Sequence, residues 1–344
     1  MTNAHSFPLL RLPLLAAIKG IHLMNVREQF KLSKLSKRSL FIVKNSVKKQ
    51  CYQLQLDFRK EFPVTINNLT AKNEYRFNLL PFDKYPDVES IKQLLVQVAA
   101  VFSNLSIHLD CSKAPHPRYL MDLVPLTKNL NLKRGLLVIS TDEPDDKLCR
   151  FIFKECNDFK QLRIYCKTST DFEISPERIG SFRTDHFEIH DSWFTINHVL
   201  HSFMNCKKLD LSSLNFTVTK VNAFLQNWIQ GSGVHFLRCK ISEDEVNMEA
   251  LLQGMTAVLK PVGMIRFDGS RISRHHKCFI IQQSNGVKGV VCVLERKHFY
   301  LSTVFELENG EKYGNHEEEV RCWTEVDDES FDRPPPGFIY RVLK

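Results

Sequence analysis

Two adjacent histidines and a nearby cysteine, His275, His276 and Cys278, come closest to a metal-binding pattern. A structural zinc site takes four ligands, which usually come as two pairs with a long stretch of chain between them. The three residues are almost contiguous, lack a distant second pair, and no Cys-x-x-Cys occurs in the sequence. We therefore expect no metal ion and no cofactor.

His201 and Asp210 are of the types that make up catalytic triads, but no nucleophile accompanies them. The sequence contains no Gly-x-Ser-x-Gly motif. It also lacks both the GxGxxG and the GxxxxGK[ST] glycine-rich motifs that hold phosphates. The pattern predicts no catalytic residue and a protein that is not itself an enzyme.

The cysteines are spread over the whole chain without a disulfide-type spacing. Without a secretory signal, reduced thiols in a cytoplasmic or nuclear compartment are the better interpretation. They are Cys51, Cys111, Cys149, Cys156, Cys166, Cys206, Cys239, Cys278, Cys292 and Cys322.

Positive charge is concentrated at the start of the chain. Residues 1–60 hold 12 Lys and Arg against 2 Asp and Glu, whereas the remainder holds 35 against 37, so the net charge of +8 arises in the first module. A basic module suits nucleic acid, an acidic membrane surface or an acidic protein. Few aromatic residues are interleaved with the lysines, which argues against single-stranded nucleic acid and favours an acidic protein.

Three short helices are predicted within the first fifty residues. One begins at Pro13, a residue suited to the first helical position, and runs to about Met24. Asn25 and Glu28 form a capping-box pattern that opens the second, and 36–47 forms the third. Such short helices bury little surface alone and need a partner or an attached domain.

This N-terminal stretch resembles the F-box of the large nematode F-box family. The matching residues, in order, are Phe7-Pro8-Leu9-Leu10-x-Leu12-Pro13, Met24-Asn25, Leu32-Ser33, Ser36-Lys37-Arg38-Ser39 and Ile42-Val43-Lys44. The resemblance implies docking on a Skp-type adaptor and, through it, on a cullin-based ubiquitin ligase. It also implies that Leu32 and Val43 lie nearer the core of the F-box, and that the adaptor contact is made by Leu12, Pro13, Leu14 and Ile18. The alternative is that these apolar residues only close a small helical core.

The apolar run 9–24 also has some character of a secretory signal. Arg11, Pro13 and Lys19 interrupt it and no clear basic segment precedes it, so we do not expect a signal peptide. No run of eighteen apolar residues occurs, so no membrane partner is expected.

Alternating strands and helices fill the middle of the chain. A strand is predicted at 52–58 and the clearest helix at 88–102. Strands then recur from Leu105, Leu136, Leu162, Phe187, Leu209 and Phe236. The helices expected between or after them are 119–130, 145–156, 176–182, 194–206 and 218–229, with a further one from the Ser242-x-x-Glu245 capping box to Leu252.

Two folds fit this alternation. An irregular leucine-rich-repeat-like domain would stack strand–helix units side by side, because no single unit can bury its own apolar face. An ordinary α/β domain with a different winding is the rival. Residues 192–241 also resemble the type-2 F-box-associated domain, on the motifs Leu200-x-x-Phe203-Met204-Asn205-Cys206 and Asn222-x-Phe224-Leu225-x-x-Trp228-x-x-Gly231, followed by Phe236-Leu237. We expect Trp228 to lie in the core rather than in a binding surface.

The C-terminal part changes to β-hairpins and then to an acidic tail. Asp268-Gly269 is a strong turn signal, and an Arg-x-Asp-Gly hairpin resembles the end of the associated domain. Residues 306–332 hold 11 acidic and 2 basic residues and are followed by three prolines, a composition typical of loosely packed or disordered chain.

The expected fold class is α+β or α/β. The expected domains are an F-box at 7–50, linker strands and a helix at 51–103, the repeat region at 104–260, hairpins at 261–305 and a tail at 306–344. The predicted function is the substrate-recognition subunit of a Skp–cullin–F-box ubiquitin ligase, which binds an unidentified protein substrate. A repeat-type interaction protein without a ligase role is the alternative, and a nucleic-acid-binding protein is disfavoured by the lack of a known reader motif.

Overall fold

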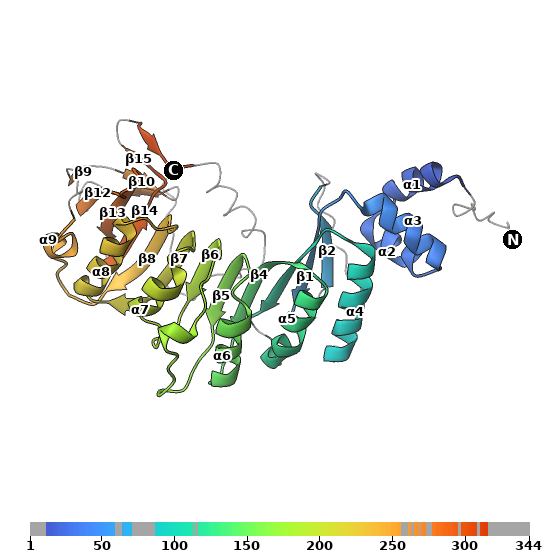
Figure 1. Cartoon of the computed structure of the whole chain (residues 1–344), viewed down its shortest axis with the longest axis horizontal. Helices are drawn as coiled ribbons and strands as arrows, with labels where there is room; N and C mark the ends of the chain where they lie inside the picture. The colour runs from blue at the N-terminus through green and yellow to red at the C-terminus, as the bar shows by residue number, and fades with distance from the viewer. Residues whose placement is uncertain are drawn as a thin grey trace, which may run out of the picture.

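The computed structural model describes residues 12–58, 64–70, 87–112, 114, 116–255, 261–262, 265–267, 270–272, 277–294, 297–307 and 310–315. Figure 1 shows an elongated molecule with three small helices at its N-terminal end and a long sheet leading away from them.

The three N-terminal helices are α1 (Leu14–His22), α2 (Val26–Ser33) and α3 (Lys37–Val47). The predicted box of Asn25 and Glu28 caps α2, with reciprocal backbone–side-chain hydrogen bonds of 2.9 Å. Ser36 and Ser39 form an equivalent box at the start of α3. These caps satisfy amide groups that a helix start leaves without an intrahelical partner, which helps such short helices to form.

The main sheet has twelve strands in the order β2-β1-β3-β4-β5-β6-β7-β8-β14-β13-β12-β9. From β1 and β3 to β8 each strand pairs in parallel with the next along the sheet. A doubly wound α/β sheet reverses its strand order at a switch point. The described parallel strands β1 and β3 to β8 follow one another in chain order without such a reversal, and β2 is an antiparallel edge strand on the other side of β1. Their bounds are β1 Tyr52–Asp57, β2 Val64–Asn68, β3 Leu105–Cys111, β4 Lys133–Ser140, β5 Gln161–Tyr165, β6 His186–Ile189, β7 Lys208–Phe216 and β8 Phe236–Ile241.

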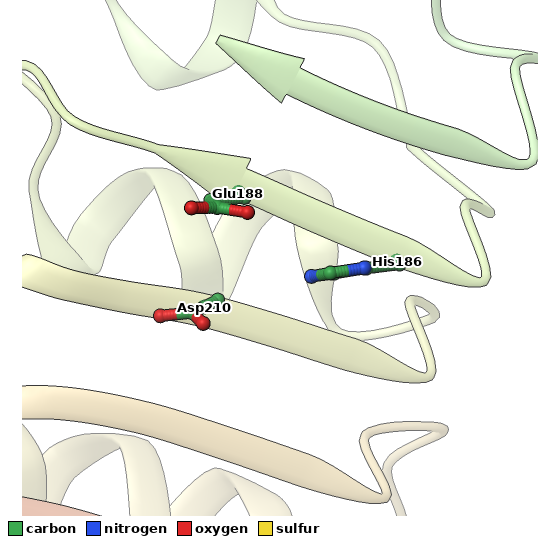
Figure 2. Close-up of side chains that lie close together, drawn as sticks. All are labelled: His186, Glu188 and Asp210. Carbon is green, nitrogen blue, oxygen red and sulfur yellow. The ribbon is translucent and has the colours of Figure 1, made fainter. Parts of the chain in front are cut away.

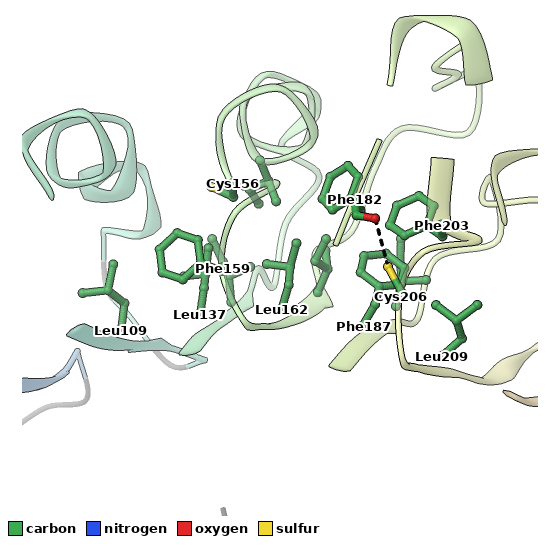
Figure 3. Packing of buried hydrophobic residues seen from close by; sticks show 14 of the residues in the cluster. Leu109, Leu137, Cys156, Phe159, Leu162, Phe182, Phe187, Phe203, Cys206 and Leu209 are labelled. Atoms are coloured by element: carbon green, nitrogen blue, oxygen red, sulfur yellow. Dashed lines mark hydrogen bonds between the residues drawn. The ribbon is translucent and has the colours of Figure 1, made fainter. Parts of the chain in front are cut away.

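One row of apolar side chains crosses the sheet from strand to strand. The register aligns one fully buried residue from each of nine strands, namely β1, β3 to β8, β14 and β13, and Figure 3 shows several of them pointing at the helices. Such a row makes adjacent units share one continuous core. Its members are Leu56, Leu109, Leu137, Leu162, Phe187, Leu209, Leu237, Leu301 and Val291.

Helices of uneven length connect the parallel strands. The predicted helix at 218–229 has the predicted bounds, and those at 88–102, 119–130 and 145–156 differ by one residue at each end or less. The observed elements are α4 Val88–Val101, η2 Pro117–Tyr119, α5 Leu120–Asn129, α6 Asp146–Glu155, η3 Pro176–Arg178, α7 Ile196–His198, η4 Val199–Phe203, α8 Val218–Ile229 and α9 Met248–Leu251.

The helix predicted at 176–182 is wrong: only a single 3-10 turn, η3, forms there. The Ser175 hydroxyl bonds to the side chain of Glu177 instead of capping a helix. Ile179 then takes an extended conformation. Ile179 and Phe182 are both buried in consequence.

Phenylalanine rings fill the space that a longer helix would have occupied between β5 and β6. The Phe203 ring lies 4.3 Å from that of Phe187 and 4.5 Å from that of Phe182, centroid to centroid. Figure 3 shows this cluster beside the leucines of the neighbouring strands. Aromatic burial thus replaces helix–sheet packing at this point of the sheet.

The helix predicted from the Ser242 capping box also starts elsewhere. The Glu243 carboxylate accepts a hydrogen bond of 2.9 Å from the backbone N–H of Val218 and so caps α8. Helix α9 begins only after Asn247, whose side chain accepts from the N–H groups of Glu249 and Ala250. A tertiary contact has overridden the local sequence signal.

Antiparallel strands complete the fold at its C-terminal end. Strand β14 pairs with β8 and is followed outward by β13, β12 and β9. A second sheet has the order β11-β10-β15-β16. Its strands β15 and β16 lie within 305–313, most of which we had expected to belong to the tail. Residues 268–269 and 316–344 lie outside the described residues. The bounds are β9 Pro261–Val262, β10 Ile265–Phe267, β11 Ser270–Ile272, β12 Lys277–Gln282, β13 Lys288–Leu294, β14 His298–Ser302, β15 Phe305–Leu307 and β16 Lys312–Tyr313.

Trp228 is fully buried, as expected of a core residue. Its indole N–H donates a hydrogen bond of 2.8 Å to the carbonyl of Val234. Its ring lies against Gly289 of β13, where an added Cβ would come within 2.8 Å of the ring. Trp228 thereby joins helix α8 of the parallel part to the antiparallel strands.

Candidate functional site

The N-terminal helices carry large apolar side chains that the rest of the described chain leaves exposed. Leu15 of α1 is 76% exposed and Leu23, which follows α1, is 90% exposed. Leu35, between α2 and α3, and Phe41 of α3 are also exposed. Together with Leu14, these residues form what we call the apolar helix surface. Five of the eight large apolar side chains that are exposed in the described part of the chain belong to this short N-terminal segment, and exposed apolar area of larger extent usually marks a site of protein association.

The four predicted adaptor-binding residues differ in their surroundings. Pro13 and Leu14 are exposed, with Leu14 at 46%. Leu12 and Ile18 are only partly exposed and pack against the core. Only Pro13 and Leu14 are therefore freely available for a partner.

Sequence analysis missed Leu15, Leu23, Leu35 and Phe41. We searched for apolar residues at helical spacing, and that spacing identifies the buried stripe: Ile21, Val43 and Val47 are all buried. The exposed residues would have been found by looking for large apolar residues that lie outside the buried stripe.

Exposed basic residues lie on the same helices as this apolar surface. Lys31, Lys34, Lys37, Arg38 and Lys44 are all exposed. The ammonium group of Lys34 lies 4.3 Å from the centroid of the Phe30 ring, where a cation–π contact orders the side chain. An acidic protein fits this combination of charge and apolar area.

A second group of polar side chains lies on the sheet face opposite the helices. The strand register places Arg163, Glu188, Asp210 and Arg238 next to one another on β5 to β8, and we call them the charged row. Arg238 donates two hydrogen bonds to Asp210, of 3.0 and 2.7 Å. Arg163 Nε lies 3.8 Å from a Glu188 oxygen, too far for a hydrogen bond.

His186 lies on β6 beside the charged row. Figure 2 shows its ring pointing toward the space between the carboxylates of Glu188 and Asp210. Ligand atoms of these three residues all lie within 4.8 Å of one another. His186 is 7% exposed, and its Nε2 atom has no hydrogen-bond partner.

The electrostatic environment fixes the protonation of these groups. Burial, assisted by the positive charge of Lys208, lowers the pKa of His186 to about 3. Burial alone would raise the pKa of Glu188, but hydrogen bonds from His190 and Tyr165 lower it to about 2. The imidazole is therefore neutral and the carboxylate ionised at neutral pH.

Catalytic chemistry finds no support among the described residues. The Asp210 carboxylate orients the guanidinium of Arg238 rather than the imidazole of His201, which is exposed on η4. Nine cysteines are free thiols, and all of these except Cys51 are buried. Burial raises the pKa of the Cys206 thiol to about 11, which suppresses the nucleophilic thiolate. The pair His275 and His276 lies outside the described residues.

Across the described ranges, no helix combines the length and apolar character needed to cross a membrane.

Comparison with known proteins connects the middle of the chain with a family. Residues 175–239, from the η3 turn to β8, match the model of the F-box-associated family. The chain is also similar to the Skn-1 dependent zygotic transcript 15 protein of Caenorhabditis elegans, at 24% identity over 141 residues. That alignment covers 41% of this chain and 41% of the relative, so the chain spans about two fifths of the length of the protein it matches.

Proposed function

We propose that this chain is the substrate-recognition subunit of a Skp–cullin–F-box ubiquitin ligase. Helices α1 to α3 are the F-box and dock on a Skp-type adaptor, which connects the chain to a cullin. The sheet domain binds the protein substrate. Ubiquitin transfer belongs to other subunits, and this chain contributes the positioning of a substrate next to them.

The observation that carries the proposal is the apolar helix surface, together with the exposed basic residues on the same helices. Leaving Leu15, Leu23 and Phe41 exposed has no benefit for the stability of the chain, because burial of apolar area is what stabilises a fold. A permanent partner that covers them explains their presence. The match of residues 175–239 to the F-box-associated family supports the assignment, because such domains accompany F-boxes.

The domain division follows from the same proposal. The F-box occupies 7–50, and the leucine-rich-repeat-like part runs from the linker at 51–103 through the repeat region at 104–260. The parallel strands in chain order support a repeat origin. We place the hairpin region at 261–313 rather than 261–305, because β15 and β16 belong to its second sheet, and the tail at 314–344.

The test is capture of a purified Skp-type adaptor by the intact chain and by a Leu14→Asp variant. Leu14 is suited to the purpose because it is 46% exposed, so the change leaves the core intact. Val96→Asp is a matched control, since Val96 is 47% exposed and lies on helix α4. Leu12 and Ile18 are poorer targets because both contribute to packing.

The proposal expects the intact chain and Val96→Asp to capture the adaptor and Leu14→Asp to lose it. Failure of the folded intact chain to bind any Skp-type adaptor would exclude the ligase role. The alternative, a repeat-type interaction module whose helices associate with something else, would then hold. Equal capture by both variants would place the adaptor contact elsewhere on the chain.

A further inference from the structure

Three potential metal ligands converge on the face of the sheet that the helices do not cover. His186 and Glu188 project from β6, and Asp210 projects from the neighbouring strand β7, as Figure 2 shows. Divalent first-row metals bind a ligand set of one imidazole nitrogen and two carboxylate oxygens. The three ligand atoms lie within 4.8 Å of one another, whereas ligands around a tetrahedral zinc ion are about 3.4 Å apart. The three side chains must therefore move closer together when an ion binds.

The unpartnered nitrogen of His186 is a second, independent observation. Its Nε2 atom is shielded from solvent and has no hydrogen-bond partner, although the ring is turned toward the two carboxylates. A buried polar atom without a partner costs free energy, roughly 1–3 kcal/mol for a neutral group. Native structures rarely keep such an atom unless a ligand or water satisfies it. A bound cation satisfies it.

The carboxylates keep free lone pairs for a metal despite their existing contacts. One oxygen of Asp210 accepts from Arg238 Nε and from the N–H of Ser212, while the other accepts from Arg238 Nη2. Glu188 has a hydrogen bond to His190, at 3.0 Å, and accepts another from Tyr165. Since each carboxylate offers about four lone-pair sites, capacity remains on both groups.

Surrounding groups already hold the two carboxylates in place. Arg238 orients Asp210, and His190 orients Glu188. Hydrogen-bonded outer groups of this kind are a regular feature of protein metal sites, where they fix the ligands in position. Three positive side chains oppose a cation here. Arg238 is 35% exposed and therefore screened by water, whereas Arg163, 3.8 Å from Glu188, is only 11% exposed, and Lys208 also acts on His186.

We propose that His186, Glu188 and Asp210 bind a zinc ion on the sheet face opposite the helices. Three protein ligands leave one tetrahedral position for water or for a donor atom of a bound protein. This departs from our expectation from the sequence of no metal site. His186 and Asp210 come from different strands, so their proximity depends on the β6–β7 register and not on a short spacing.

The test is titration of the metal-free full-length chain with zinc chloride by calorimetry, in the presence of a phosphine reductant. We expect one zinc ion per chain at this site. His186→Gln and Glu188→Gln should each weaken binding by at least roughly tenfold. His201→Gln is the matched control, because His201 is an exposed histidine on the helical side, and it should bind as the parent does. Circular dichroism confirms that each variant is folded, and Glu188→Gln decides the matter if His186→Gln does not fold.

Cobalt(II) supplies a spectroscopic readout of the ligands. Substituted cobalt should show visible d–d absorption without thiolate charge-transfer bands, because no cysteine is in the proposed set. Zinc binding that is absent in the folded parent, or unchanged in both variants, would overturn the proposal. Thiolate bands in the cobalt spectrum would do the same, since they would place the ion on a cysteine.

Discussion

Gly289 and Trp228 form a contact whose energetics can be worked out from the structure. A Cβ atom at position 289 would lie 2.8 Å from Cη2 and 3.1 Å from Cζ2 of Trp228. Both atoms belong to the six-membered ring of the indole, and the side chain is fully buried. Gly289→Ala therefore forces an extra methyl group into a packed core, and such overpacking lowers the free energy of unfolding by about 1–3 kcal/mol.

Trp228→Phe removes the atoms that a methyl group at position 289 would meet. Alone, it loses the hydrogen bond to the Val234 carbonyl and leaves a small void, at a cost of about 2–4 kcal/mol. In the double variant the methyl group enters that void. We expect the double variant to be less destabilised than the sum of the single variants, by about 1 kcal/mol or more. Some crowding persists, because Leu301 also lies 3.1 Å from the added atom.

The assay is urea unfolding of the four proteins, followed by far-ultraviolet circular dichroism because Trp228→Phe alters the fluorescence signal. The coupling is obtained from the four unfolding free energies, with the slopes checked for equality. Strictly additive costs would refute the contact between α8 and β13, because uncoupled sites do not share packing atoms. A stable Gly289→Ala single variant would refute it as well.

Two further outcomes follow from the described contacts. Arg118 Nε and Nη2 donate hydrogen bonds of 2.7 and 3.2 Å to the Asp145 carboxylate, and the backbone N–H of Leu148 donates another. Burial raises the pKa of Asp145, but these hydrogen bonds outweigh it, so the pKa is lowered overall. The resulting stabilisation is present above the unfolded pKa of about 3.9 and is lost as the pH falls through the folded pKa. Arg118→Gln should therefore lower the free energy of unfolding at pH 7 and lower it less near pH 2, as measured by urea unfolding at both pH values. An equal cost at both pH values would contradict the linkage. Asn25→Ala removes the N-cap of α2 and should lower the unfolding free energy of the N-terminal helices by about 1 kcal/mol. The effect is measured as faster hydrogen exchange of the backbone amides in α2. Unchanged exchange would show that packing alone stabilises the helix.

Local sequence signals predicted an element correctly where caps and apolar spacing within the segment itself determine its structure. Helix α8 has the predicted bounds because Thr217 caps it and its apolar stripe is regular. The Asn25 box capped its helix for the same reason. The Ser242 box did not form because the Ser242 hydroxyl donates to Glu243 instead of capping a helix with Glu245. Glu243 in turn accepts from the N–H of Val218 at the start of α8, 25 positions away, a contact that no local pattern records.

The two candidate sites were predictable to different degrees. The N-terminal helices were located from their caps and spacing, yet spacing alone ranked the half-buried Ile18 with the exposed Leu14. The cluster of His186, Glu188 and Asp210 was not predicted, since it needs the alignment of β6 with β7. Alternation showed which strands exist, but pairing register is a tertiary property.

The insertion of β14 beside β8 has a consequence for synthesis on the ribosome. Strand β8 ends at Ile241, whereas its neighbour β14 ends at Ser302, so 61 further residues must be translated before the β8 edge is paired. At about 5–20 residues per second this takes roughly 3–12 s. During that interval the nascent chain presents an open edge with unpaired backbone groups, the kind of surface that chaperones cover and that neighbouring nascent chains can add to. Pairing of β14 with β8 therefore closes the edge at which the incomplete sheet is exposed to aggregation.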